Sequence, residues 1–242
     1  ARAWKERVMK AILLALLVAL STPVLAQERI AVELLIDDSG VLLNADAAQS
    51  HKLLLLSHLK ALATKRAGAN AKIEVISTSY GRTVWSGTPL AIRRDPARAQ
   101  ELVDAVSADP GRCNNLPGAF AELRSNLAQL EREGVNTVHI IVFSSLVHTP
   151  RPCADLTTIT LPQLPPAEGD IAGALTSSKI IRSVSFYWVS PHQRIVWEQF
   201  LSAAFTGLRN GGARVSFFDV ERSKSALYDS PFNVAPVVES AP

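Results

Sequence analysis

The sequence predicts an α/β fold: a doubly wound, mostly parallel six-stranded sheet with helices on both faces and a short antiparallel third strand. Strand and helix patterns alternate along the chain, which is typical of a sheet covered by helices. The strand at 138–144 is almost wholly apolar, as parallel strands covered on both faces are. Only residues 79–81 connect the second strand to the third, and a parallel crossover needs about a dozen residues, so that pair must be antiparallel.

The first half of the chain contains three predicted strands and two predicted helices. The strands are residues 30–36, 71–78 and 82–86. A helix is predicted from about Asp46 to Arg66, because three leucines recur on one face of it: Leu53, Leu56 and Leu59. Asp95-Pro96 predicts the start of a second helix that runs to about Val106, since Asp is a preferred N-cap and Pro suits the first helical position.

The second half continues the alternation. The expected elements are a helix at 116–133, a strand at 138–144, a short helix at 170–177, a strand at 183–189, a helix at 191–209 and a strand at 214–220. Prolines between Leu146 and Gly169 exclude a helix or a central strand there, because proline lacks the N–H that both need. We expect a long ordered loop or a mobile cover, and long loops in compact domains are often functional.

The first 26 residues have the pattern of a secretory signal peptide. Basic residues precede an apolar run at 11–20, and small residues end it at 24–26. The run is too short to span a bilayer comfortably, although an uncleaved anchor is the alternative. We therefore expect translation to start at Met9 and the protein to be exported, either to the periplasm or out of the cell. We expect no transmembrane span in the mature chain. The predicted domain covers 27–222, and a C-terminal tail covers 223–242.

Charge and cysteine content restrict the partners and the compartment further. The first 26 residues carry a net charge of +3, the same as the whole chain, so the remainder is near neutral. Nucleic-acid binding needs a basic surface, so no nucleic-acid partner is expected.

Cys113 and Cys153 are the two cysteines, and an even count in an oxidising compartment indicates a disulfide. Closing that loop of roughly 40 residues would stabilise the fold by about 4 kcal/mol at best.

The most informative motif follows the first strand, which ends in Asp37-Asp38-Ser39-Gly40. In open α/β sheets, ligands bind just outside the carboxyl ends of the strands. The strand ending in Asp-x-Ser, the long helix after it, the hairpin, and the loop Cys113-Asn114-Asn115-Leu116 before a helix resemble the von Willebrand factor type A domain. The resemblance covers about residues 29–221.

Domains of that family carry a metal-ion-dependent adhesion site. The resemblance implies that the ligand positions of this site are occupied here by Asp37, Ser39, Asn114 and Ser144. This sequence departs from the family pattern, because Val41 replaces a serine, Asn114 replaces a threonine, and no carboxylate follows the fourth strand. Mg²⁺ prefers oxygen ligands that include carboxylate charge, and one of these four residues is charged. We expect a degenerate site that binds no cofactor, or Mg²⁺ only weakly.

The resemblance and the missing catalytic groups together imply a non-catalytic module that binds a protein partner in the cell envelope. The binding loops would be 37–44, 111–117 and 145–170, and the contacting residues would be Asp38, Asn115, Ser145 and His148. Two alternatives stay open. One is a phosphatase-like hydrolase with Asp37 as nucleophile, in which Ser39 occupies the place of the general acid. The other is a structural subunit of an envelope assembly, bound through Trp85 and the sheet edge.

Overall fold

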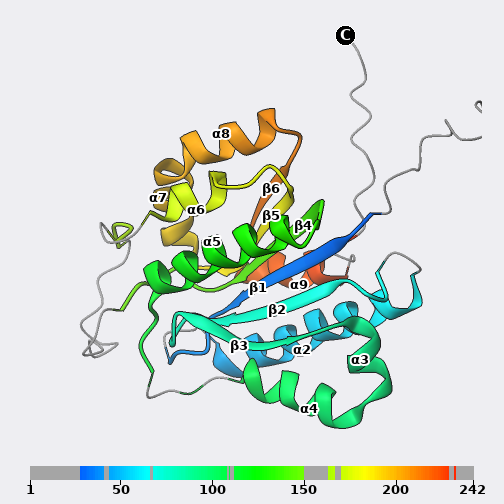
Figure 1. The fold of residues 1–242 in the computed structure, drawn as a ribbon. Coiled ribbons are helices and arrows are strands. Elements are labelled where there is room, and N and C mark those ends of the chain that lie inside the picture. Colours follow the sequence, from blue (N-terminus) through cyan, green and yellow to red (C-terminus); the bar gives the residue numbers. More distant parts are fainter. Residues whose placement is uncertain are drawn as a thin grey trace, which may run out of the picture.

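Six strands form a sheet in the order β3-β2-β1-β4-β5-β6, as the computed structural model in Figure 1 shows. The strands are β1 (Ile30–Ile36), β2 (Lys72–Ser77), β3 (Arg82–Gly87), β4 (Thr137–Phe143), β5 (Ile181–Val189) and β6 (Arg214–Asp219). Each neighbouring pair is parallel except β2 and β3, which are antiparallel. The predicted fold class is therefore confirmed, including the antiparallel third strand.

The structure describes residues 28–40, 44–65, 68–107, 109, 112–149, 163–166, 170–228 and 232. The expected signal segment, Val41 and Cys153 lie outside these residues, as do most of the proline-rich segment and the tail beyond Phe232. Within the described ranges, no helix is long and apolar enough to cross a membrane.

The carboxyl ends of β1, β2 and β4 lie at the same level of the sheet. Ile36 is paired with Ser77 of β2 and with Phe143 of β4. The backbone bonds continue one residue further, since Asp37 N donates to Phe143 O (2.9 Å) and Thr78 N donates to Ile36 O (3.0 Å). The loops that follow these strands therefore leave the sheet side by side, at what we call the carboxyl edge.

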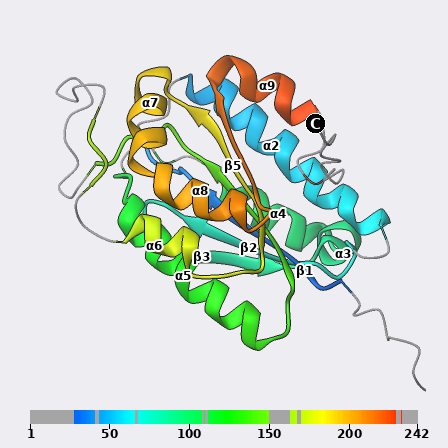
Figure 2. The same ribbon diagram turned by 90° about the horizontal axis from the view of Figure 1, so that it is seen from above.

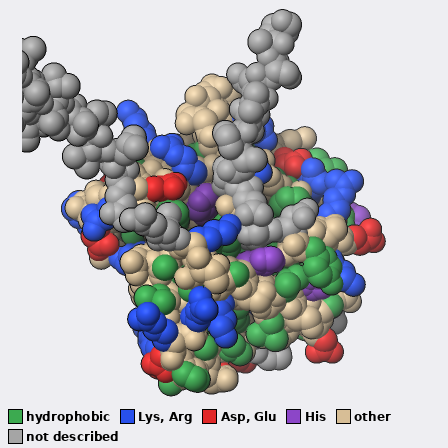
Figure 3. Space-filling model, turned by 90° about the vertical axis from the view of Figure 1, so that its right-hand side faces the viewer, with side chains coloured by type: hydrophobic (Ala, Val, Ile, Leu, Met, Phe, Trp, Pro, Cys, Tyr) green, Lys and Arg blue, Asp and Glu red, His purple; other side chains and the backbone are tan. Residues whose placement is uncertain are grey.

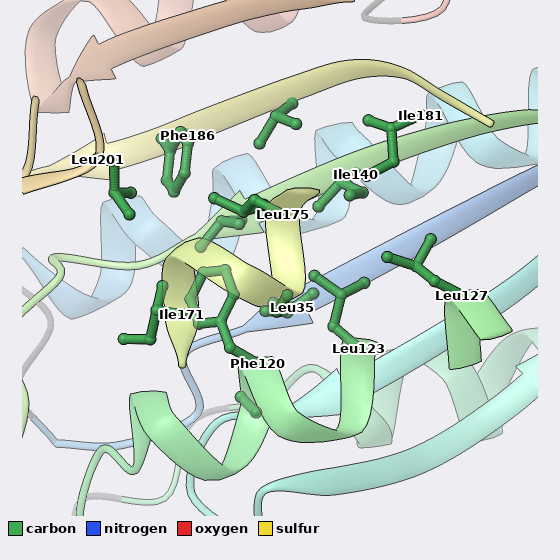
Figure 4. Packing of buried hydrophobic residues seen from close by; sticks show 14 of the residues in the cluster. Leu35, Phe120, Leu123, Leu127, Ile140, Ile171, Leu175, Ile181, Phe186 and Leu201 are labelled. Atoms are coloured by element: carbon green, nitrogen blue, oxygen red, sulfur yellow. The ribbon is translucent and has the colours of Figure 1, made fainter. Parts of the chain in front are cut away.

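One face of the sheet is covered by four helices: α5 (Leu116–Arg132), α6 (Ile171–Thr176), α7 (Pro191–Phe200) and α8 (Ser202–Asn210). Figure 4 shows Phe120 and Leu123 of α5 packed with Leu35 of β1 in the core of this face. Asn115 N donates to Thr78 O (2.9 Å), which places the start of α5 at the carboxyl edge.

The opposite face is covered by α2 (Ala45–Ala61), its 3-10 continuation (Leu62–Thr64), α3 (Pro89–Arg94), α4 (Pro96–Ala105) and α9 (Val220–Tyr228). The helices α2 and α9 lie side by side (Figure 2). The buried residues of α2 are Ala48, Lys52, Leu55, Leu56 and Leu59. The prediction that Leu53 is buried is wrong, since its side chain is 43% exposed. The buried face instead runs through Ala48, Lys52 and Leu55, which recur at helical spacing.

Three helices differ from the sequence prediction. The helix expected at 191–209 is two helices, α7 and α8, because the backbone leaves helical geometry at Leu201 (φ −93°, ψ 7°). The helix α3 is not predicted, although its start has a clear signal in Thr88, which caps it by accepting a hydrogen bond from Ala91 N (3.1 Å).

The helix α9 is the third difference. It follows β6 directly and buries Ser223 and Leu227 fully, and the Ser223 hydroxyl accepts a hydrogen bond from Trp188 N (2.7 Å). The packed chain thus continues to Tyr228, past the domain end expected at residue 222.

Surface charge is mixed on the face of the molecule that Figure 3 shows. Lys and Arg side chains and Asp and Glu side chains both occur on it. This face lacks the uniformly basic character on which nucleic-acid binding depends.

Candidate functional site

Four side chains from three loops meet at the carboxyl edge. Asp37 and Ser39 follow β1, Asn114 precedes α5, and Ser144 follows β4. Each is at most 1% exposed. The structure therefore brings together all four residues at the ligand positions of the resemblance, and we call this group the Asp37 centre.

The carboxylate of Asp37 accepts four hydrogen bonds. Its Oδ1 accepts from the Ser39 hydroxyl (2.5 Å) and from Ser39 N (3.1 Å). Its Oδ2 accepts from the Ser144 hydroxyl (2.8 Å) and from Asn114 Nδ2 (2.8 Å). A carboxylate offers about four lone-pair directions, so this one is fully used.

The side chain of Asn114 turns its nitrogen toward the centre. Besides Asp37, its Nδ2 donates to the backbone oxygen of Val147 (2.8 Å) and lies 3.3 Å from the Ser144 hydroxyl. Because a backbone carbonyl can only accept, this contact fixes the amide orientation. Asn114 Oδ1 is buried and has no hydrogen-bond partner in the part of the chain that the structure describes.

The loop after β4 is bound to the loop before α5 through the backbone of Asn114. Asn114 N donates to the Thr149 hydroxyl (2.6 Å), and Thr149 N donates to Asn114 O (2.9 Å). His148 Nδ1 also lies 2.9 Å from Asn114 O. The half-buried imidazole therefore lies beside the centre.

A buried lysine lies next to the centre, and the sequence analysis missed it. Lys52 of α2 is 1% exposed, and its ammonium donates to the backbone oxygens of Asp37 (2.7 Å) and Val106 (3.1 Å). Burial lowers the pKa of Lys52 to about 8, and attraction to Asp37 and Asp38 opposes that shift. The spacing of Ala48, Lys52 and Leu55 on one helix face was the signal that could have identified it.

Burial also acts on the carboxyl group of Asp37. Removal from water raises the pKa of Asp37 above its usual range, while hydrogen bonds from Ser39 and Ser144 and the charge of Lys52 lower it in part. These neighbours, rather than solvent, stabilise the charged form of Asp37.

Asp38 points away from the centre and joins a different set of residues. Its carboxylate accepts from the Ser77 hydroxyl (2.7 Å), from Ser79 N (3.0 Å) and from Arg112 Nη1 (3.1 Å). The Arg112 guanidinium also lies over the ring of Tyr80, 4.5 Å from its centroid. Asp38 thus links the hairpin turn to the loop before α5 and is itself 2% exposed.

The remaining residues expected to contact a partner lie at the same edge. Asn115 is half-buried and caps α5 by accepting from Gly118 N (3.2 Å). Ser145 is 1% exposed, and its backbone oxygen accepts from Ser190 N (3.3 Å). Cys113 is buried beside Asn114, and its expected partner, Cys153, lies outside the described residues, so the disulfide stays a prediction.

Two bulky residues near the edge have left-handed backbone conformations. Leu146 has φ 61° and Trp188 has φ 66°, a region that such residues rarely adopt. The oxygen of Leu146 accepts from Gln193 Nε2 (3.2 Å) and from Trp197 Nε1 (3.0 Å), which hold the turn in place. Backbone strain of this kind is concentrated at functional sites.

The Asp37 centre does not fit a divalent cation. Both carboxylate oxygens of Asp37 are occupied by donors, and Asn114 presents N–H rather than oxygen to it. No group of three or more His, Cys, Asp or Glu residues able to hold a metal ion occurs in the described ranges. Mg²⁺ needs several oxygen ligands in near-octahedral geometry, and the residues in place do not offer them.

The two alternative functions meet physical obstacles. As a phosphatase nucleophile, Asp37 would need a free carboxylate oxygen, but it is fully buried and accepts four hydrogen bonds. As a contact on the sheet edge, Trp85 would need exposure, but it is 5% exposed and Arg98 lies over its ring.

Comparisons with known proteins identify the fold. Neither a protein-family model nor a curated protein matches the sequence. The structure is similar to a variant of the PilB minor pilin from Streptococcus sanguinis, with a TM-score of 0.50 and 12% identity, over 86% of this chain and 62% of that chain. This chain thus spans less than two thirds of the pilin.

Two weaker similarities are to a pilus adhesin and to a parasite protein. The SpaC adhesin from Lactobacillus rhamnosus GG, in its open conformation, has a TM-score of 0.48 and 12% identity, over 83% of this chain and 29% of that chain. The manganese-loaded TRAP protein of Plasmodium vivax has a TM-score of 0.41 and 10% identity, over 77% and 74%. At such identities the similarity shows the fold alone, and the fold is von Willebrand factor A-like.

Proposed function

We propose that this chain, whose fold is von Willebrand factor A-like, is an exported, non-catalytic module that binds a protein partner of the cell envelope. The binding surface is the carboxyl edge, with the loops at 37–44, 111–117 and 145–170. We place the protein in the periplasm or outside the cell, after removal of the signal segment.

The observation that carries this proposal is an exposed aromatic residue at that edge. Tyr80, in the hairpin turn, is 43% exposed. Two guanidinium groups lie over its ring, with Arg112 at 4.5 Å and Arg82 at 5.3 Å from its centroid. Tyrosine and arginine are enriched among the residues that dominate binding energy, and a side chain already held in place loses little entropy on binding.

Unpartnered polar atoms at the same edge support the proposal. Eight buried side-chain polar atoms have no hydrogen-bond partner among the described residues. Four of them lie at the carboxyl edge, in loops that follow strands or precede α5: Thr78 Oγ1, Ser79 Oγ, Asn114 Oδ1 and Ser190 Oγ. Buried polar atoms are normally paired. Their concentration at one edge is expected if a partner or ordered water forms the missing hydrogen bonds.

The fold comparison supports the location of the partner. The PilB minor pilin, as its name states, is a component of a pilus. By analogy of fold, we propose an envelope or surface assembly as the setting for this chain, and analogy of fold does not fix the partner itself.

Binding is tested with the purified chain immobilised and exposed to solubilised native envelope. Tyr80→Ala should lower the amount of the bound partner roughly tenfold or more, as loss of a dominant contact does. Tyr228→Ala is the matched control, because Tyr228 is 66% exposed at the end of α9 and should change nothing. Equal retention by wild type and Tyr80→Ala would refute binding through this edge.

We also propose the disulfide between Cys113 and Cys153. Peptide mapping by mass spectrometry without reduction should recover the two cysteine peptides as one linked species. Recovery of both as free thiols from freshly purified exported protein would reject the bond.

A further inference from the structure

We propose that Lys52 supplies, from within the protein, the positive charge that a divalent cation supplies in the type of site this fold resembles. On this account the Asp37 centre is a metal-independent junction between loops. Lys52 is then a positioning residue of the carboxyl edge. The inference does not depend on whether the edge binds a partner.

A divalent cation has no place to bind at the Asp37 centre. Both oxygens of Asp37 are occupied by donors from Ser39, Ser144 and Asn114. A metal ion would have to displace at least one of these donors, and all of them are buried at 1% exposure or less. Each displaced donor would be left unpaired in the interior, which is costly.

The negative charge of Asp37 requires compensation inside the protein. A fully buried carboxylate without a nearby cation is strongly unfavourable. Asp38 has a cation of its own in Arg112, at 3.1 Å. Among the described residues, Lys52 places a cation at Asp37, since its Nζ lies 2.7 Å from the backbone oxygen of that residue.

The ammonium group of Lys52 is held by two backbone oxygens. Lys52 Nζ binds the backbone oxygen of Asp37 at the end of β1 and that of Val106 at the end of α4. It therefore binds the backbone of the turn, and the Lys52 side chain is 1% exposed. A flexible lysine fixed by two carbonyl oxygens is a built-in charge, and the carboxylate oxygens of Asp37 are bound by Ser39, Ser144 and Asn114.

The carboxylate of Asp37 and the ammonium group of Lys52 join separate segments of the chain. The carboxylate links the loop after β1 to the loop before α5 and the loop after β4, through Ser39, Asn114 and Ser144. The ammonium links the same turn to the end of α4. Together they hold four segments of the chain with protein groups alone.

The first experiment measures amide hydrogen exchange of the full wild-type chain after treatment with EDTA, alone and with excess Mg²⁺ or Mn²⁺. Exchange at residues 37–40, 112–116 and 144–149 should be equal within about twofold with and without metal. Slowing of about tenfold or more at these residues on addition of either metal would overturn the proposal. This measurement needs no variant.

The second experiment is a double-mutant cycle with Lys52→Met and Asp37→Asn, read by urea unfolding. In the wild-type background, Lys52→Met should raise the unfolding equilibrium constant roughly a hundredfold, because it leaves a buried charge uncompensated. In the Asp37→Asn background, Lys52→Met should raise the unfolding equilibrium constant by a clearly smaller factor. An equal factor in both backgrounds would show that Lys52 acts through packing and its carbonyl contacts alone, and would overturn the proposal.

The matched control is Lys60→Met, a change of the same type at an exposed position of the same helix. It should alter the unfolding constant by no more than about twofold. If a variant of the cycle fails to fold, the wild-type exchange measurement decides the question.

Discussion

Glu33 lies in the middle of β1, and its side chain is fully buried. It is paired in register with Glu74 of β2, which is 8% exposed. Asn126 Nδ2 of α5 donates to Glu33 Oε2 (3.1 Å). Burial first, and the neighbouring Glu74 second, raise the pKa of Glu33 well above its ordinary value in the folded protein.

The stability of the protein should therefore depend on pH through Glu33. Because its pKa is raised in the folded state, the folded protein binds more protons than the unfolded chain, and stability falls as pH rises from the ordinary value near 4.5 through the raised one. Urea unfolding across this range should show the decline in the wild type and a flatter profile in Glu33→Gln. Parallel profiles for the two proteins would contradict the assignment.

At the residue scale, the sequence predicted which side chains meet but not how they interact. The resemblance of the Asp-x-Ser turn and of the loop after the fourth strand to the von Willebrand factor A pattern implied that Asp37, Ser39 and Ser144 lie together. The role of Asn114 as a donor depends on the position of Val147 O, which no local pattern encodes. Lys52 was missed because lysine is read as a solvated residue, although its helix position is buried.

At the element scale, the start of α5 depends on a single cap. The side chain of Asn115 accepts from Gly118 N (3.2 Å), which satisfies one of the N–H groups at the helix start that lack a partner. A Cβ at Gly118 would lie 2.4 Å from Asn115 Nδ2, so a larger residue at this position would displace the capping side chain.

Replacement of the cap should weaken the fold by a measurable amount. Asn115→Ala should lower the free energy of unfolding by about 1 kcal/mol, and Asn115→Ser should lose much less, because serine also caps. Urea titration monitored by circular dichroism measures both. If alanine proved as stable as asparagine, the cap would have no role in stability.

Element ends with a local signal were predictable, and those set by packing were not. The Asp95-Pro96 start of α4 was predicted because a cap acts within a few residues, and Asp95 indeed accepts from Ala97 N (2.9 Å). The break at Leu201 has no proline or glycine to mark it. Leu201 is fully buried in the core under α7 and α8, so long-range packing determines where the helix bends.

At the scale of the whole molecule, the sheet ends at β3 on one side, and side chains occupy this edge. Thr83 N donates to Glu122 of α5 (2.9 Å), and Arg98 of α4 donates to the backbone oxygen of Ser86. Edge strands with unpaired backbone groups promote association, and charged side chains over the edge suppress it.

Removal of these two side chains should therefore cause self-association. The double variant Glu122→Ala/Arg98→Ala should form dimers or larger species at concentrations where the wild type shows fewer of them, as measured by sedimentation velocity. Arg93→Ala/Glu221→Ala is the control, because it removes the same charges from exposed positions away from the edge. Identical sedimentation of both variants would refute the protective role.

The order of the strands was not predicted from the sequence, although the fold class was. Alternation of strands and helices, together with the short turn at 79–81, fixed the class and the antiparallel pair. Long-range contacts determine which strand lies beside β1, and its neighbours β2 and β4 are what bring Thr78 and Ser144 next to Asp37.

The central claim is that protein groups alone assemble the carboxyl edge around Asp37. A crystal of the chain soaked in Mn²⁺, with anomalous scattering recorded, tests it most directly. The account predicts no anomalous peak at Asp37 and the Lys52 ammonium in contact with Asp37 O and Val106 O. A manganese peak within about 2.2 Å of Asp37, Ser39 and Ser144 oxygens would contradict it.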